Sequence, residues 1–173
     1  MKKIITICSA LILCSLNALA NPGQHPAPVM PKDFETLKKL VGTWEGKAKM
    51  HSDKEEDVTV VYELTSGGTA ITEKLMPGTL NEMVSIYYKD GKSLAMTHYC
   101  AKGNHPEMKL KKSSDTAISF EMVGVKGISS AKEAHMHAIT LSMPDANTLK
   151  QDWVNFQDGK KNMTAIFSFK RKL

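Results

Sequence analysis

The sequence predicts an all-β protein, a single antiparallel up-and-down β-barrel of about ten strands with a short N-terminal helix closing one end. Three observations support this fold class. From Thr43 onward, apolar and polar residues alternate with a period of two, which is typical of strands. Turn-forming residues separate the alternating segments at short intervals, and the pattern of a βαβ unit is missing from the sequence.

The alternation defines ten candidate strands, which follow one another through short turns. Glycine, asparagine, aspartate and proline gather in nearly all of the connections, such as Asp90-Gly91 and Asp158-Gly159. The expected strands are Thr43–His51, Val58–Thr65, Thr69–Met76, Glu82–Lys89, Ser93–Ala101, Glu107–Lys112, Ala117–Val123, Ala134–Met143, Thr148–Phe156 and Met163–Arg171. Strands in simple succession favour a closed barrel, because closure removes the exposed edges.

A short helix is expected just before the first strand. Asp33 is the expected N-cap, and Phe34–Val41 carries its apolar residues on one side. Gly42 is expected to end the helix.

The N-terminal segment has the pattern of a targeting signal. Residues 1–20 contain two lysines, then an apolar run, then the small-residue site Ala18-Leu19-Ala20. This order is typical of a cleaved secretory signal peptide. The run is shorter than the ~20 residues that a spanning helix needs, so no membrane span is expected. Residues 21–32 are proline-rich and predict an extended arm, and 33–173 form the barrel domain. We therefore expect a periplasmic protein.

The net charge and the cysteine content indicate which partners and which kind of stabilisation to expect. The formal net charge is +5, and loss of Lys2 and Lys3 with the signal peptide leaves 21 basic against 18 acidic residues, a net charge of +3. So mild a charge does not indicate a nucleic-acid partner. Cleavage would leave Cys100 as the one cysteine, so an apolar core rather than an internal disulfide must hold the fold. The oligomeric state is left open.

The first and last strands predict how the barrel closes. Trp44, Gly46 and Ala48 share one face of the first strand, and the small residues at 46 and 48 suggest free space inside. Arg171 shares a face with two phenylalanines of the last strand.

The segment Leu40-Val41-Gly42-Thr43-Trp44-Glu45-Gly46 resembles the Gly-x-Trp opening of the calycin superfamily, which includes lipocalins, fatty-acid-binding proteins and nitrobindin-like haem-binding barrels. The segments around His98, His105 and His135 are also similar to a group of uncharacterised bacterial exported proteins. The resemblance implies a helix at the barrel floor, a structural Trp44 and a cation–π contact from Arg171. Its implied functions are ligand or haem binding.

Candidate site residues interrupt the apolar faces of three strands. Glu73 lies between Ile71 and Leu75, and His135 and His137 are in phase with Ile139. A few placed polar groups in an apolar lining are typical of a ligand cavity. The candidates for the cavity are Glu73, Met96, His98, Cys100, His135, His137, Trp153 and Asn155.

The histidines leave two cofactor alternatives open. His135-x-His137 has a spacing at which two imidazoles can bind one transition metal, completed by His98 or Glu73. Cys100 and the methionines would favour copper at such a site. A single histidine could instead ligate haem. The interpretation that we favour is that these histidines are structural and that no cofactor binds.

No catalytic triad order, phosphate-binding glycine loop or paired-carboxylate motif occurs in the sequence, so we do not expect an enzyme. The expected function is an exported protein that binds a small, largely apolar molecule inside the barrel. The alternatives are a haem- or metal-binding barrel and a filled structural barrel, for example one serving in envelope stress.

Overall fold

The computed structural model describes residues 28–50 and 54–173. The expected signal peptide and most of the expected arm lie outside the described residues. The described part of the chain folds into one helix, α1, and ten strands, with a short 3₁₀ turn at Ser66–Gly68. The elements are α1 Phe34–Lys38, β1 Gly42–Lys49, β2 Glu56–Thr65, β3 Ala70–Leu75, β4 Met83–Asp90, β5 Ser93–Tyr99, β6 His105–Ser113, β7 Ala117–Lys126, β8 His135–Asp145, β9 Thr148–Gln157 and β10 Lys160–Arg171.

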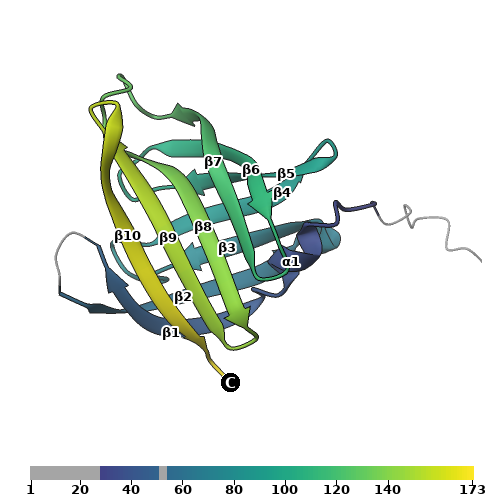
Figure 1. The fold of residues 1–173 in the computed structure, drawn as a ribbon. Coiled ribbons are helices and arrows are strands. Elements are labelled where there is room, and N and C mark those ends of the chain that lie inside the picture. Colours follow the sequence, from purple (N-terminus) through teal and green to yellow (C-terminus); the bar gives the residue numbers. More distant parts are fainter. Residues whose placement is uncertain (1–27, 51–53) are drawn as a thin grey trace, which may run out of the picture.

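The strands form a closed antiparallel barrel in which each strand pairs with its neighbours in the chain (Figure 1). The first and last strands, β1 and β10, pair with each other and complete the circle, with Trp44 opposite Arg171 and Ala48 opposite Phe167. The predicted fold class, strand succession and closure are therefore confirmed.

Helix α1 lies at one end of the barrel, beside the start of β7 (Figure 1). Phe34, Leu37 and Leu40 are fully buried and cap the apolar core at this end. Lys39 donates to the Asp115 carbonyl at 2.8 Å, which ties the helix to the β6–β7 turn. The opposite end, where the β3–β4, β5–β6 and β9–β10 connections lie, is called here the open end.

The helix is shorter than the sequence suggests. It ends at Lys38, and the following amides of Leu40 and Val41 bond to carbonyls three residues back, which continues the chain as a tighter turn. Asp33 occupies the N-cap but its side chain makes no capping hydrogen bond. Gly42 has a φ of 128°, a conformation that favours glycine, and opens β1 directly.

The seam between β1 and β10 is organised around Trp44. Its indole Nε1 donates to the Leu40 carbonyl at 2.7 Å, and the guanidinium of Arg171 lies 4.0 Å from its ring centroid. Arg171 also donates to the carbonyls of Val41 and Lys39 at 2.8 and 2.6 Å. The expected cation–π contact is present, and the Arg171 side chain joins the last strand to the segment that leads into the first.

Gly46 does not leave free space inside the barrel, contrary to the sequence-based interpretation. A Cβ added to Gly46 would lie 1.9 Å from the carbonyl oxygen of Ser168 on β10. Glycine is required because the two backbones approach closely at the seam. The neighbouring Ala48 is opposite Phe167, which is buried and occupies interior volume that a larger residue at 48 would need.

Candidate functional site

A cavity of about 270 Å³ lies at the open end of the barrel. Its walls come from β4, β8, β9 and β10, from the residue that follows β1, and from the β3–β4 and β5–β6 connections. The lining residues are Met50, Met76, Asn81, Met83, Cys100, Ala101, Lys102, Met136, Asn155, Met163, Ala165 and Phe167. Most of these side chains are apolar or contain sulfur, so the cavity offers a soft apolar surface with few hydrogen-bonding groups.

Methionine dominates this lining. Five of the twelve lining residues are methionine, against 11 of 173 in the whole sequence. The Cys100 thiol lies 4.0 Å from the thioether sulfur of Met83. Because methionine side chains are flexible and polarisable, the lining can adapt to ligands of different shape.

A buried polar network crosses the barrel interior beneath this cavity. Tyr87 donates to one carboxylate oxygen of Glu73 at 2.5 Å, and Gln151 donates to the other at 3.1 Å. Gln151 also donates to the Tyr62 hydroxyl at 2.6 Å and accepts from the Trp153 indole at 2.9 Å. These five side chains are buried and come from β2, β3, β4 and β9, so the network fills the middle of the barrel and joins opposite walls.

The network perturbs the titration of its acidic group. Burial raises the pKa of the Glu73 carboxyl from 4.5 to about 7, although hydrogen bonds from Tyr87, Gln151 and Tyr62 act in the opposite direction. Burial, followed by the nearby charge of Glu73, raises the pKa of Tyr62 and of Tyr87 well above the ordinary value of 10.0. Burial therefore favours the protonated form of the Glu73 carboxyl up to a pH of about 7.

His98 lies between this network and the cavity. Its Nδ1 is 3.0 Å from the Ser85 hydroxyl, and its ring packs on Trp153 with a centroid separation of 4.4 Å. Its Nε2 is buried and has no hydrogen-bond partner. Burial lowers the pKa of His98 to about 4, with a smaller contribution from His105, so the imidazole is neutral at physiological pH.

The remaining predicted site residues, on β9 and on or just after β5, also face the interior. Cys100 and Asn155 line the cavity, and Asn155 donates to the His135 carbonyl at 3.0 Å. Trp153 is buried under the cavity floor. Met96 is fully buried beside Met108 in the core, away from the cavity lining.

His135 and His137 lie on the outer wall of the barrel. The pairing of β8 with β9 shifts between Met136 and Ala138, where a β-bulge changes the phase of the strand. His135 therefore pairs with the outward Phe156, and the ring of His137 stacks on the same phenylalanine at 3.8 Å. Met136 takes the inward position and lines the cavity instead.

The expected three-histidine metal set is not assembled by this geometry. His98 is inside the barrel while His135 and His137 are outside, and the described residues contain no group of three His, Cys, Asp or Glu side chains that could hold a metal ion. The spacing of the histidines could not predict this separation, because the alternation of apolar and polar residues along one strand does not reveal a bulge.

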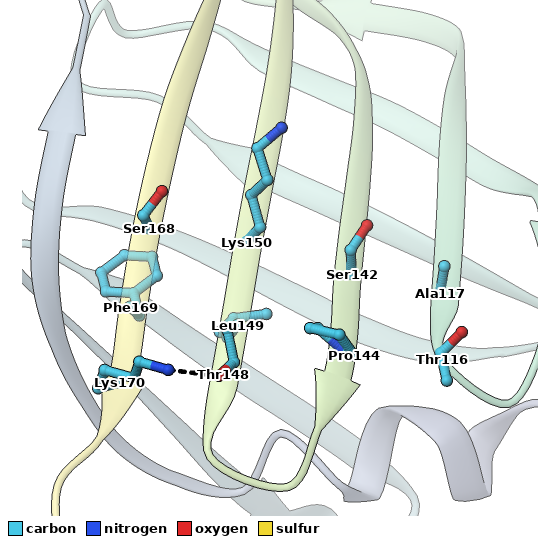
Figure 2. Close-up of a pocket in the computed structure, with 10 residues that line it drawn as sticks. All are labelled: Thr116, Ala117, Ser142, Pro144, Thr148, Leu149, Lys150, Ser168, Phe169 and Lys170. Atoms are coloured by element: carbon cyan, nitrogen blue, oxygen red, sulfur yellow. Dashed lines mark hydrogen bonds between the residues drawn. The ribbon is translucent and has the colours of Figure 1, made fainter.

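A second hollow lies on the outer wall across β7, β8, β9 and β10. Figure 2 shows Ala117, Ser142, Lys150 and Ser168 side by side on adjacent strands, with Lys170 bonded to Thr148 at 2.7 Å. Its small and hydroxyl side chains form a shallow surface, and its charged groups are lysines in contact with solvent. It lacks the buried polar groups that would fix a ligand, so the interior cavity is the stronger candidate site.

Several site residues were missed by the sequence interpretation. Tyr62, Ser85, Tyr87 and Gln151 complete the polar layer, and the five methionines line the cavity. Gln151 carried a usable signal, because it shares a strand face with the predicted Trp153 and Asn155. The methionines were considered only as a group, as soft ligands that would favour copper, and the sequence did not indicate which of them line the cavity.

Comparison with known proteins supports the fold. No protein-family model and no curated protein sequence matches the chain. The structure is similar to Rv2717c from M. tuberculosis, with a TM-score of 0.56 and 14% identity over 84% of this chain and 100% of that chain. It is also similar to a protein of unknown function from the DUF3598 family of Nostoc punctiforme, with a TM-score of 0.54 and 10% identity. That match covers 79% of this chain and 49% of the other.

At these identities the likeness shows the fold alone. The two neighbours and the closed ten-strand topology of the described residues agree on an antiparallel β-barrel fold. Within the described residues, no helix has the length and hydrophobicity to cross a membrane.

Proposed function

We propose that this chain is an exported binding protein that holds a small, largely apolar molecule at the open end of its barrel. The observation that carries the proposal is the cavity of about 270 Å³ with its methionine-rich lining. Cavities for drug-sized ligands are typically about 300–1,000 Å³, so this one suits a molecule at or below the lower limit. Asn155 and Asn81 supply the polar atoms that would orient such a ligand.

Ligand binding can be tested with indole as a small apolar probe. In protein labelled with ¹³C-methyl methionine, indole should shift the signals of Met83, Met136 and Met163 and leave Met108, which is buried outside the cavity, unchanged. Native mass spectrometry of protein purified from its own host would then identify any molecule that is retained naturally.

A matched pair of alanine-to-leucine variants shows which hollow binds the probe. Ala165→Leu places extra volume in the interior cavity and should abolish the indole response, whereas Ala117→Leu changes the outer-wall hollow of Figure 2 and should not. The reverse result would assign binding to the outer wall. An indole response that is absent from the wild-type protein would contradict the proposal.

Export is the second part of the proposal, and it rests on the signal-peptide pattern of residues 1–20. N-terminal sequencing of the protein from its host should read from Asn21, and cell fractionation should recover it from the periplasm. A mature protein that begins at Met1 in the cytoplasm would contradict this part.

Haem, which the nitrobindin-like resemblance implies, does not fit this cavity. A porphyrin is larger than most ligands of cavities near 300 Å³, and no histidine is among the residues that line the space. His98, the interior histidine of the described residues, is held between Ser85 and Trp153 below the lining. We therefore assign haem no role in the function.

A filled structural barrel is the second candidate function, and the buried network around Glu73 favours it. Side chains occupy the middle of the barrel, and a protein that serves only as a scaffold needs no more than this. The Ala165→Leu variant distinguishes a filled structural barrel from a binding protein. In a structural barrel the wild type gives no indole response that the variant could lose, and filling the unused cavity should raise the melting temperature.

A further inference from the structure

We propose that Cys100 and Met83, together with other methionines of the same cavity, form a binding site for a soft monovalent metal ion, Cu(I). This inference goes beyond the binding of an apolar molecule, because it depends on the sulfur atoms of the lining and not on its apolar area. The two kinds of binding can therefore be separated by substitutions that remove sulfur and keep volume.

The positions of the two sulfurs follow from the pairing of β4 with β5. Val84 pairs with Tyr99 at the open end of these strands, and Met83 and Cys100 are the next residues along the two chain segments. Their sulfurs are 4.0 Å apart. With metal–sulfur bonds of about 2.3 Å, two sulfurs in one tetrahedral or trigonal shell are separated by about 3.8–4.0 Å. The pair is thus spaced for one shared ion.

Further donors surround this pair. The four other lining methionines are Met50, Met76, Met136 and Met163, which come from four other segments of the chain. Their unbranched side chains have the freedom to bring a third sulfur to the ion. His98 lies two residues before Cys100, and its buried Nε2 has no hydrogen-bond partner, so its imidazole is a further candidate donor.

The donor chemistry selects the ion. Thioethers and thiolate are soft ligands that favour Cu(I), whereas carboxylates and carbonyls favour Mg²⁺ and Ca²⁺. Glu73, the carboxylate of the interior network, is already bonded to Tyr87 and Gln151. Within residues 28–50 and 54–173, no three His, Cys, Asp or Glu side chains gather for a harder ion.

Charge balance also favours a monovalent ion. When Cu(I) binds, the Cys100 thiol releases its proton to solvent, and the thiolate and the ion together are neutral. A neutral complex avoids the cost of an unpaired charge in an apolar cavity. Lys102 is the charged residue of the lining, and it is exposed at the rim, where water screens its ammonium group.

The test is a competition titration of the full chain with Cu(I), kept reduced by ascorbate without oxygen, against bathocuproine disulfonate. The wild-type protein should bind one equivalent. Met83→Leu and Cys100→Ala should each weaken binding by more than about tenfold, because even loss of a group that only supports a metal ligand costs about 10–100-fold. Met108→Leu removes a buried sulfur outside the cavity and serves as the control.

Retained thermal stability of each variant shows that the fold is intact. The proposal would be overturned if the wild-type protein bound no Cu(I), or if Met83→Leu and Cys100→Ala bound it as tightly as the control. Indole binding to Met83→Leu separates this result from the proposed function, because leucine keeps the apolar lining. For Met83→Leu we expect loss of Cu(I) binding with a retained indole response. Loss of the indole response with retained Cu(I) binding would contradict only the proposal of an apolar ligand.

Discussion

Gln151 on β9 and Glu73 on β3 join opposite walls of the barrel through a hydrogen bond of 3.1 Å, although they are 78 residues apart in the chain. The bond lies within a network in which every other member is also buried. This contact fixes the distance between the walls just below the cavity. Titration of Glu73 and removal of Gln151 should therefore each have a measurable effect on stability.

Replacing Glu73 by an amide should change the pH dependence of folding. The carboxyl has a pKa of about 7 in the folded protein and 4.5 as its ordinary value, so between these values the folded state holds a proton that the unfolded state has lost. The stabilisation by this proton is complete below pH 4.5 and is lost as the pH rises through 7.

The free energy of unfolding of the wild type, relative to Glu73→Gln, should therefore fall by on the order of 3 kcal/mol between pH 4.5 and 7 and remain constant at higher pH. Urea unfolding at a series of pH values measures this difference. Parallel curves for the two proteins would show that Glu73 does not titrate in this range.

Removing Gln151 should destabilise the barrel without emptying a large volume. Gln151→Ala leaves the Trp153 indole and the Glu73 carboxylate each without one partner in a buried setting. We expect a loss of about 2–5 kcal/mol in the free energy of unfolding. The exposed neighbour Lys150, whose side chain pairs with Asp152 at the surface, is the control, and Lys150→Ala should cost less than about 1 kcal/mol.

The contacts of Arg171 should depend on its planar guanidinium as well as on its charge. Lysine at this position keeps the positive charge over Trp44 but carries its donors on one nitrogen, so it cannot reproduce the contacts that three guanidinium nitrogens make with the Ala146, Val41 and Lys39 carbonyls. Arg171→Lys should lower the free energy of unfolding by about 1–3 kcal/mol. Chemical denaturation followed by tryptophan fluorescence tests this, and an unchanged midpoint would mean that the cation–π contact alone stabilises the seam.

The close approach at the β1–β10 seam predicts an unusually severe alanine substitution. In Gly46→Ala the new methyl group would overlap the Ser168 carbonyl, so the two strands must separate, at a cost of about 3 kcal/mol or more. Gly124→Ala on β7 is the matched control, because its nearest neighbour is a Glu107 side-chain oxygen at 3.8 Å. Equal melting temperatures for the two variants would contradict this account of the seam.

Local patterns predicted most of the barrel. The alternation placed all ten strands of the described chain within a few residues of their observed ends, because each turn carries residues suited to its backbone. Gly91 and Gly159, for example, have φ values of 61° and 74° in the β4–β5 and β9–β10 turns. The largest errors were at the β7–β8 connection, where β7 continues to Lys126, and at Lys160, where β10 begins earlier than expected.

The candidate site was only partly predictable, for two physical reasons. A bulge at Met136–Ala138 reversed the faces of His135 and His137, and a bulge depends on pairing with the neighbouring strand rather than on the sequence of one strand. The cavity lining and the Glu73–Gln151 bond unite residues from distant strands, and alternation within a strand gives no information on which residues of other strands they meet.

The pairing of the first strand with the last has a consequence for the kinetics of folding. Along the described chain, neighbouring strands pair across short connections, whereas Trp44 and Arg171 pair across nearly the whole domain. Such a distant contact costs far more loop entropy than a hairpin and slows folding. Until Lys170 and Arg171 dock, β1 presents an unpaired edge that can recruit another chain. We therefore expect the final docking step to limit the folding rate, and a chain that lacks β10 to aggregate rather than to fold.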